Sequence, residues 1–330
     1  MKPILCNYYL TYRCNGKCVF CEIWQHAKYQ KTKDANVEQV FQNLVELKKI
    51  GIRFIDFTGG EPLLYQELPA VLSTARRLGF FTSVTTNGYF YASLAEPLKG
   101  LVDFLHFSLD SMEKTQNDTL RGQPFFERVI ENVKIARALN EKPDILFTVT
   151  ENNYQQIEPL RNYCAANQLI LIVNPVFGYG NVASLKPAIL KYLDNFRNKP
   201  FIYLNRAFQR FRQQGGNQIQ QPRCRAMSST IVISPDNKIL APCFHHAIAE
   251  IPIETSIQAI LKAKSYLELK SRQGQFPFCQ DCVINCYLDP SFTHHFDRYW
   301  WLSTFSKAKY VFDKYIRPYF ILGERGFEIL

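Results

Sequence analysis

Eight of the ten cysteines in this 330-residue chain fall into two groups. The first group is Cys14, Cys18 and Cys21, and the second, late in the chain, comprises Cys224, Cys243, Cys279, Cys282 and Cys286. In a reducing compartment, thiols at such spacings are metal ligands or catalytic groups more often than disulfides. The sequence therefore predicts two metal or cluster sites. Cys6 and Cys164 lie in apolar stretches, and we expect them in the core.

The first group places three thiolates on one short loop. Cys14, Cys18 and Cys21 can bind three irons of a cubane cluster and leave the fourth iron open to an outside ligand. A structural zinc site would need a fourth protein ligand, for which His26 is the nearby candidate. The spacing favours the cluster, with zinc as the alternative.

The second group has ligands enough for a closed site. Cys224 and Cys243 bracket a predicted hairpin, whereas a zinc ribbon would use two close pairs. The pattern favours a cluster that transfers electrons. Four of the five cysteines suffice for a closed cluster. Cys286 is therefore either the fourth ligand, a spare thiol, or a replacement for one of Cys224, Cys243, Cys279 and Cys282. We expect His245 and His246, which follow Cys243, to be hydrogen-bonding neighbours of the cluster.

Strand and helix patterns alternate through the first half of the chain. Strands are predicted at residues 4–10, 54–58, 80–85, 104–109, 145–150 and 169–173. Helical patterns follow most of them, at residues 37–47, 68–78, 125–139 and 157–166. This is an α/β pattern typical of a partial (β/α)6 TIM-like barrel. The first cysteine loop follows the first strand, at the edge where such barrels hold their active sites.

The rhythm breaks after Pro175, and we divide the chain into four segments. A core barrel covers residues 1–180, and a basic helical linker with Phe201, Leu204, Phe208 and Phe211 on one helix face covers residues 181–222. A small hairpin-plus-helix domain that binds the second cluster covers residues 223–290, and an aromatic-rich helix covers residues 291–330. Residues 230–233 and 238–240 are the predicted hairpin strands.

Two motifs together carry a resemblance to a known family. The cysteines have spacings of three and two residues with Phe20 before the last, and Thr58-Gly59-Gly60-Glu61-Pro62 follows the second strand. The segment from about residue 4 to residue 175 resembles the radical S-adenosylmethionine (SAM) superfamily. The late cysteines resemble its twitch or shortened SPASM extension, which holds one auxiliary 4Fe-4S cluster.

The resemblance implies a 4Fe-4S cluster on Cys14, Cys18 and Cys21, with SAM bound at the open iron. It assigns SAM binding to strand-end residues, namely Gly59, Gly60, Glu61, Pro62, Asn87, Ser108, Asp110 and Arg121. The turn at Gly59 would hold the amino group of SAM, Ser108 and Asp110 its ribose or carboxylate, and Arg121 a carboxylate of cofactor or substrate. Capping, turn formation and a solvated arginine are the structural alternatives.

The resemblance also implies the chemistry. SAM is cleaved reductively to a 5'-deoxyadenosyl radical, which abstracts hydrogen from a small anionic metabolite or a peptide, and the auxiliary cluster transfers electrons. The partners implied are an electron donor such as flavodoxin or ferredoxin and the substrate, with no nucleic acid. The sequence names no catalytic acid or base. The alternatives are an iron-sulfur or zinc electron-transfer protein without radical chemistry, and a membrane-surface enzyme that modifies lipids.

Charge and hydropathy set the remaining expectations. The net charge is +10, and residues 186–225 hold nine basic residues and one acidic residue, a net +8. Arg206 and Arg210 in this segment would bind a phosphate or acidic peptide, or form a solvated helix face. No signal peptide or long apolar run is apparent, so we expect a cytoplasmic protein. In the tail, Trp301, Phe305, Phe312 and Ile316 share one helix face that packs on the barrel or contacts a membrane surface.

Overall fold

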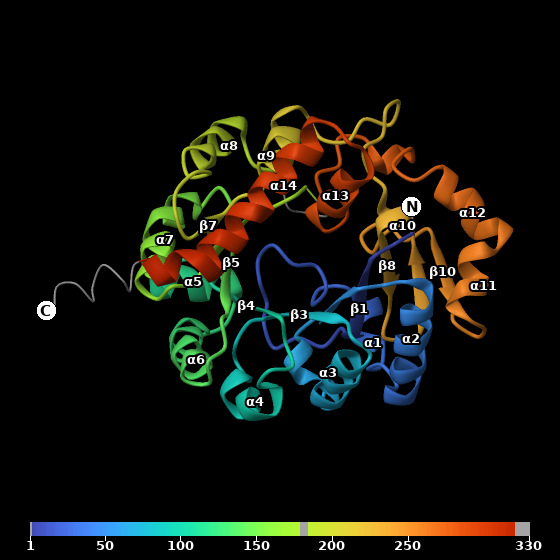
Figure 1. Ribbon diagram of the computed structural model, residues 1–330, viewed down its shortest axis with the longest axis horizontal. Helices are drawn as coiled ribbons and strands as arrows, with labels where there is room; N and C mark the ends of the chain where they lie inside the picture. Colours follow the sequence, from blue (N-terminus) through green and yellow to red (C-terminus); the bar gives the residue numbers. More distant parts are fainter. Residues whose placement is uncertain (1, 179–183, 321–330) are drawn as a thin grey trace, which may run out of the picture.

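A computed structural model describes residues 2–178 and 184–320 of the chain. Within these residues, ten strands form one sheet in the order β10-β9-β8-β1-β2-β3-β4-β5-β6-β7. The first six strands pair in parallel in chain order, which confirms the partial (β/α)6 barrel (Figure 1). They are β1 (Leu5–Thr11), β2 (Phe54–Gly59), β3 (Phe81–Thr86), β4 (Phe104–Ser108), β5 (Asp144–Val149) and β6 (Leu171–Pro175).

Helices connect these strands along the outside of the curved sheet (Figure 1). The predicted ones are α2 (Val37–Ile50), α3 (Leu68–Arg77), α6 (Phe126–Ala138) and α7 (Ile157–Ala166). Helices that the sequence analysis missed are α1 (Ala27–Lys31), α4 (Tyr91–Leu98) and α5 (Lys114–Arg121), besides the single turns η1 (Pro62–Leu64) and η2 (Tyr154–Gln156). Of these, α5 is the most important for the site.

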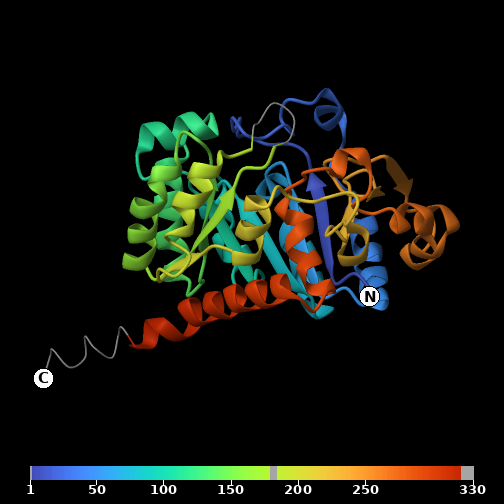
Figure 2. The same cartoon turned by 90° about the horizontal axis from the view of Figure 1, so that it is seen from above.

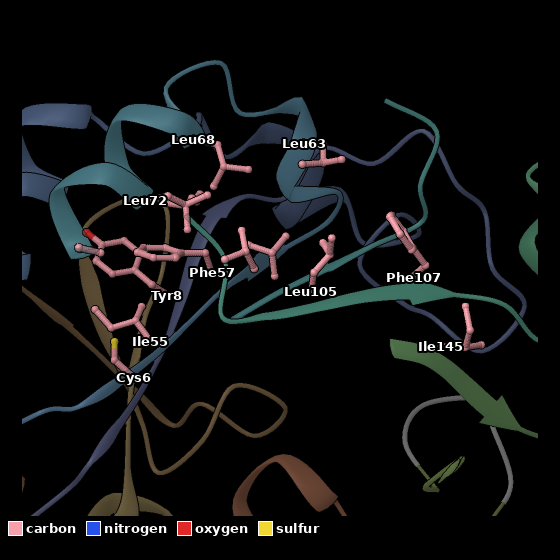
Figure 3. Close-up of a cluster of buried hydrophobic side chains, with 14 of the residues drawn as sticks. Cys6, Tyr8, Ile55, Phe57, Leu63, Leu68, Leu72, Leu105, Phe107 and Ile145 are labelled. Carbon is pink, nitrogen blue, oxygen red and sulfur yellow. The ribbon is translucent and has the colours of Figure 1, made fainter. Parts of the chain in front are cut away.

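Side chains alternate between two faces along each strand. The outward face packs against the helices as the main hydrophobic core, which includes Tyr8, Phe57 and Phe107 (Figure 3). Cys6 is part of this core, and both Cys6 and Cys164 are fully buried, as expected. The alternate positions carry polar residues such as Asp56 and Thr58, which are only half-buried. The inner face of the barrel is therefore polar.

The later elements extend the same sheet. The expected hairpin forms from β8 (Thr230–Ile233) and β9 (Lys238–Ala241), and β8 also pairs in parallel with β1. The hairpin is therefore continuous with the barrel sheet. The two edge strands of this ten-stranded sheet are β7 (Ile202–Tyr203) and β10 (Ala249–Pro252). The other elements are α8 (Pro187–Asp194), α10 (Ala226–Ser229), α11 (Ile257–Lys262), α12 (Lys264–Ser271), η3 (Pro277–Cys279), α13 (Asn285–Ser291) and η4 (Phe292–His294).

The basic linker differs from its prediction. The helix α9 (Arg206–Gln213) begins after Phe201 and Leu204, because Asn205 caps it by accepting from the backbone N–H groups of Ala207 and Phe208. Phe201 and Leu204 are buried but lie directly before and after β7. The four-segment division remains a prediction, and its first boundary, between residues 180 and 181, lies outside the described residues.

The tail forms α14 (Arg298–Val311) and a π-helical turn, η5 (Phe312–Ile316), and its last ten residues lie outside the described part. This helix runs along the edge where the barrel strands begin, opposite the cysteine loop (Figure 2). Its buried face is polar and includes Ser303, Ser306, Asp313 and Lys314. The prediction that an aromatic face packs on the barrel is wrong, because the residues of that face are all exposed, namely Trp301, Phe305, Phe312 and Ile316.

Candidate active site

The first cysteine loop leaves β1 beside the end of β2. The N–H of Gly60 donates to the carbonyl of Thr11, and that of Glu61 donates to the carbonyl of Arg13, each at 2.8 Å. A Cβ atom on Gly60 would overlap the Arg13 carbonyl, and one on Gly59 would overlap that of Thr11. The two glycines thus let β2 approach the segment that leads directly into Cys14.

Gly60→Ala is expected to displace the cysteine loop. Overpacking of this kind costs about 1–3 kcal/mol and forces backbone shifts, and here the shifting atoms belong to Arg13, next to Cys14. We expect iron bound by the first cysteine group to fall sharply after anaerobic reconstitution, measured as iron per chain. Gly100→Ala is the control, because no atom lies within 4 Å of its added Cβ, although Gly100 has a positive φ that Gly60 lacks. Equal iron in both variants would contradict the proposed role of Gly60.

Helix α5 fastens the other side of the loop. The N–H groups of Lys17 and Val19 donate to the carbonyls of Arg121 and Leu120 at 3.1 and 3.0 Å. The Arg121 guanidinium lies over the Phe20 ring at 5.3 Å, and its Nη1 is 3.8 Å from Cys18 Sγ. Arg121 is buried, so the solvated alternative is wrong for this residue.

Arg121 is paired with a carboxylate of its own chain. Its Nε lies 2.6 Å from Asp110 Oδ2, and the backbone N–H of Thr148 donates to Asp110 Oδ1 at 2.8 Å. Asp110 is fully buried, so its carboxylate holds Arg121 in place against Cys18. Among the described residues, Arg121 Nη2 has no hydrogen-bond partner. A buried donor beside the cysteine loop is thus left for a bound acceptor.

The side chains of Glu61 and Asn87 also form hydrogen bonds within the chain. Glu61 Oε1 accepts from Thr86 Oγ1 at 2.6 Å and from the Leu63 N–H at 3.1 Å, and Oε2 accepts from the Asn87 N–H at 2.8 Å. Asn87 Nδ2 donates to Asn15 Oδ1 in the cysteine loop. These contacts tie the ends of β2 and β3 to the loop. Pro62 opens the single turn η1, and Ser108 is buried at the end of β4.

The three thiols suit a cluster with positive irons. Burial raises the pKa of Cys14 to about 12 and that of Cys18 to about 11, and neighbouring thiolates add to both shifts. Metal binding to such thiols releases their protons and relieves this repulsion. His26 instead lies 3.3 Å from Glu22 Oε2. In residues 2–178 and 184–320, no three or more His, Cys, Asp or Glu side chains are placed so that they could bind one metal ion together.

The inner face of the barrel holds titratable residues that the sequence analysis missed. Burial raises the pKa of Asp56 on β2 to about 6 and lowers that of His106 on β4 to about 4. His106 Nδ1 lies 3.2 Å from Thr85 Oγ1, and Asn285 of α13 hydrogen-bonds Asn174 on β6. The sequence does contain a signal for these residues, because polar side chains occupy alternate positions of the predicted strands. His106 Nε2 also lies 3.7 Å from Asp144 Oδ2 at the start of β5, so His106 is on the side of the barrel away from the cysteine loop.

Four of the late cysteines surround one pocket. Cys224, Cys243, Cys279 and Cys282 line it together with apolar residues, and Cys286 is not part of the lining. The fully buried Asn217, another residue missed from the sequence, organises the loops around the pocket. Its Nδ2 donates to the carbonyl of Cys279, and its Oδ1 accepts from the N–H of Cys224, both at 3.0 Å. Four thiols around a common space are the donor set of a closed 4Fe-4S cluster.

Of the other residues predicted near the second cluster or in the basic linker, His246 lines this pocket and the rest lie outside its lining. His246 lines it and stacks on Phe278 at 4.7 Å, whereas His245 packs against Phe177 at 5.1 Å, and burial lowers its pKa to about 3. Burial, the Asp56 carboxylate and the Cys282 thiolate all raise the pKa of the Cys286 thiol, so Cys286 lies near both Asp56 and Cys282 without lining the pocket. Arg206 hydrogen-bonds Asn198, and Arg210 is half-buried on the same helix.

Residues 8–164 match the family model described as the Radical SAM superfamily. Among curated proteins, a probable GTP 3',8-cyclase of Sulfolobus acidocaldarius is 29% identical over 165 residues, which are 48% of this chain and 51% of the relative. A protein of the same name from Saccharolobus solfataricus is 30% identical over 200 residues, 58% of this chain and 63% of the relative. The chain thus matches about half to two thirds of the length of these curated relatives.

Solved structures share the fold. Streptococcus suis SuiB bound to S-adenosylmethionine aligns with a TM-score of 0.65 and 20% identity, covering 86% of this chain and 69% of SuiB. Native anSMEcpe with bound AdoMet aligns with a TM-score of 0.62 and 17% identity, covering 80% of this chain and 83% of that protein. Other structures of the two proteins hold the precursor peptide SuiA and a Cp18Cys peptide.

Proposed function

We propose, from the match of residues 8–164 to the radical SAM superfamily, that this chain is a radical SAM enzyme with one auxiliary cluster. The superfamily uses a 4Fe-4S cluster and SAM. Bound together, they supply reductive cleavage of SAM and a 5'-deoxyadenosyl radical that abstracts hydrogen from the substrate. The rest of the proposal concerns what the residues of this chain do.

One observation carries the proposal. Cys14, Cys18 and Cys21 lie on a loop held from one side by the Gly60 backbone and from the other by α5, with the buried donor Arg121 Nη2 beside Cys18. We propose that these cysteines hold the catalytic cluster and that Arg121 Nη2 donates to the carboxylate of SAM. Since the carboxylates of Glu61 and Asp110 are engaged within the chain, they contribute by fixing the strand ends.

We propose that the SAM site is the carboxyl edge of the sheet. Gly59, Gly60 and Pro62 shape the turn after β2, Asn87 fixes the loop through Asn15, and Ser108 lies at the end of β4. The substrate occupies the polar inner face beyond it. Small metabolites and peptides both remain candidates, and the half-buried Asp56 favours a substrate that offers it a cation or a hydrogen-bond donor.

The auxiliary cluster is assigned to Cys224, Cys243, Cys279 and Cys282, because these four thiols line one pocket. This choice leaves Cys286, which does not line the pocket, as a free thiol. A cluster with four cysteine ligands has no open iron, so its role is electron transfer. The external electron donor would be a flavodoxin or ferredoxin, and the many reduced thiols fit a cytoplasmic location.

Anaerobic reconstitution with iron and sulfide tests both sites. We expect about eight irons per chain, since each 4Fe-4S cluster contributes about four, and release of 5'-deoxyadenosine from SAM under dithionite. About four irons with nucleoside release would remove the auxiliary cluster. Clusters without nucleoside release would favour the alternative of an electron-transfer protein, and bound zinc would refute the proposal.

The exposed tail favours a second feature, peripheral contact with a membrane. Trp301, Phe305 and Tyr319 are 46%, 58% and 70% exposed on α14 and just beyond it. Trp and Tyr are typical of membrane interfaces. In residues 2–178 and 184–320, no helix has the length and apolarity to cross a bilayer. Flotation with liposomes, compared with a Trp301→Lys/Phe305→Lys variant, tests this contact and the lipid-modifying alternative.

A further inference from the structure

A buried arginine joins the late cysteines to the barrel. Arg212 of α9 is 7% exposed. Its Nη1 donates to the carbonyl of Val176 at 2.8 Å, and its Nη2 donates to those of Pro175 and Val283 at 2.6 and 3.3 Å. Pro175 ends β6, whereas Val283 directly follows Cys282. The guanidinium therefore bridges the carboxyl edge of the sheet and the loop that carries Cys279 and Cys282.

The charge of Arg212 has no carboxylate beside it in the described part of the chain. All three of its printed hydrogen bonds go to backbone carbonyls, and its Nε has no hydrogen-bond partner there. Burial lowers its pKa, and the group that favours its charged form is the Cys282 thiolate. A buried cation without a counter-ion costs several kcal/mol. A folded chain that keeps such a group implies an anion nearby.

The four-cysteine pocket is the place for that anion. Cys282 lines the pocket with Cys224, Cys243 and Cys279, and gathering four thiolates in one buried site costs free energy through their mutual repulsion. A fixed cation beside Cys282 offsets part of this cost, because opposite charges attract strongly where water is excluded. Arg121 beside Cys18 differs, since Asp110 already neutralises it. The arginine beside the first cysteine group is thus neutralised by a carboxylate, whereas Arg212 is not.

We propose that Arg212 is the counter-ion of the auxiliary cluster and raises the reduction potential of that cluster. This inference rests on the proposed auxiliary cluster. Each reduction adds one electron, and therefore one negative charge, to the cluster with its four thiolates. A nearby cation stabilises the more negative form more strongly, so the potential rises. Arg212 is a positioning residue in this scheme, because it acts through the cluster and touches no substrate.

The test compares Arg212→Gln with Arg212→Lys in the full chain carrying Cys18→Ala, in which the auxiliary cluster is the remaining one. The lysine keeps the charge, and the glutamine keeps only part of the hydrogen bonding. The midpoint potential is measured by redox titration with electron paramagnetic resonance, with iron per chain measured in parallel. Arg210→Gln on the same helix is the control for removing a cation from α9.

We expect Arg212→Gln to shift the midpoint to more negative potential, while Arg212→Lys and Arg210→Gln stay close to the parent. A second supporting result would be loss of iron in Arg212→Gln alone, while Arg212→Lys keeps its iron and the midpoint potential of the parent. That result would show that the cluster requires the charge. An unchanged midpoint in Arg212→Gln, or loss of iron in both Arg212 variants, would overturn the proposal. A parent without iron would instead refute the auxiliary cluster itself.

Discussion

Cys18→Ala is expected to reduce release of 5'-deoxyadenosine from SAM to background. The variant removes one of three ligands of the proposed catalytic cluster, and no residue near the loop replaces it, since the nearby His26 is paired with Glu22. Iron should fall from about eight to about four per chain, because only the auxiliary cluster remains. The measurements are iron analysis after anaerobic reconstitution and chromatography of the nucleoside product.

The matched control is Cys164→Ala. Cys164 is a fully buried cysteine of α7 and belongs to the hydrophobic core, so its replacement tests the loss of a thiol without the loss of a ligand. We expect this variant to keep its full complement of iron and its nucleoside release. Wild-type activity in Cys18→Ala would show that Cys18 is not a ligand of the catalytic cluster, and the assignment of that cluster to the loop would have to be abandoned.

Lys314→Met is expected to destabilise the protein by about 3–5 kcal/mol, because it leaves a buried carboxylate without its cation. Asp144, at the start of β5, is fully buried, and its Oδ2 accepts from Lys314 Nζ at 2.8 Å and from the Tyr310 hydroxyl at 2.7 Å. Lys314 is 4% exposed on η5. This ion pair anchors the tail helix across the edge of the barrel opposite the cysteine loop.

The same helix supplies the control. Lys307 lies 3.2 Å from Asp289, but both side chains are partly exposed, so Lys307→Met should cost at most about 1 kcal/mol. Thermal unfolding followed by circular dichroism should place Lys314→Met roughly 3–7 °C below Lys307→Met. The double variant Asp144→Leu/Lys314→Met should recover much of the loss. If the two lysine variants melt together, the buried pair does not anchor the helix.

The alternation of strands and helices was predictable because it depends on local patterns. Short apolar runs followed by helical spacing predicted six strands that the structure contains in the expected order. The helix α5 escaped because residues 114–121 are mostly polar and offer little apolar periodicity. The prediction for the tail was wrong because its apolar face resembled a packing face. The buried residues instead include charged ones: Lys314 pairs with Asp144 of β5, and Asp313 pairs with Arg317 of the tail itself.

The sequence alone determined the residue types and spacings: the cysteine triad, the Gly-Gly-Glu-Pro turn and their positions after β1 and β2. Only the tertiary structure decided their partners. Arg121 lies beside Cys18 although 103 positions separate them, four of the late cysteines share a pocket that excludes Cys286, and β8 joins the sheet at β1. The physical reason is that spacing along a chain fixes which groups are neighbours within a loop, whereas burial and pairing between distant segments depend on how the whole sheet curves and packs.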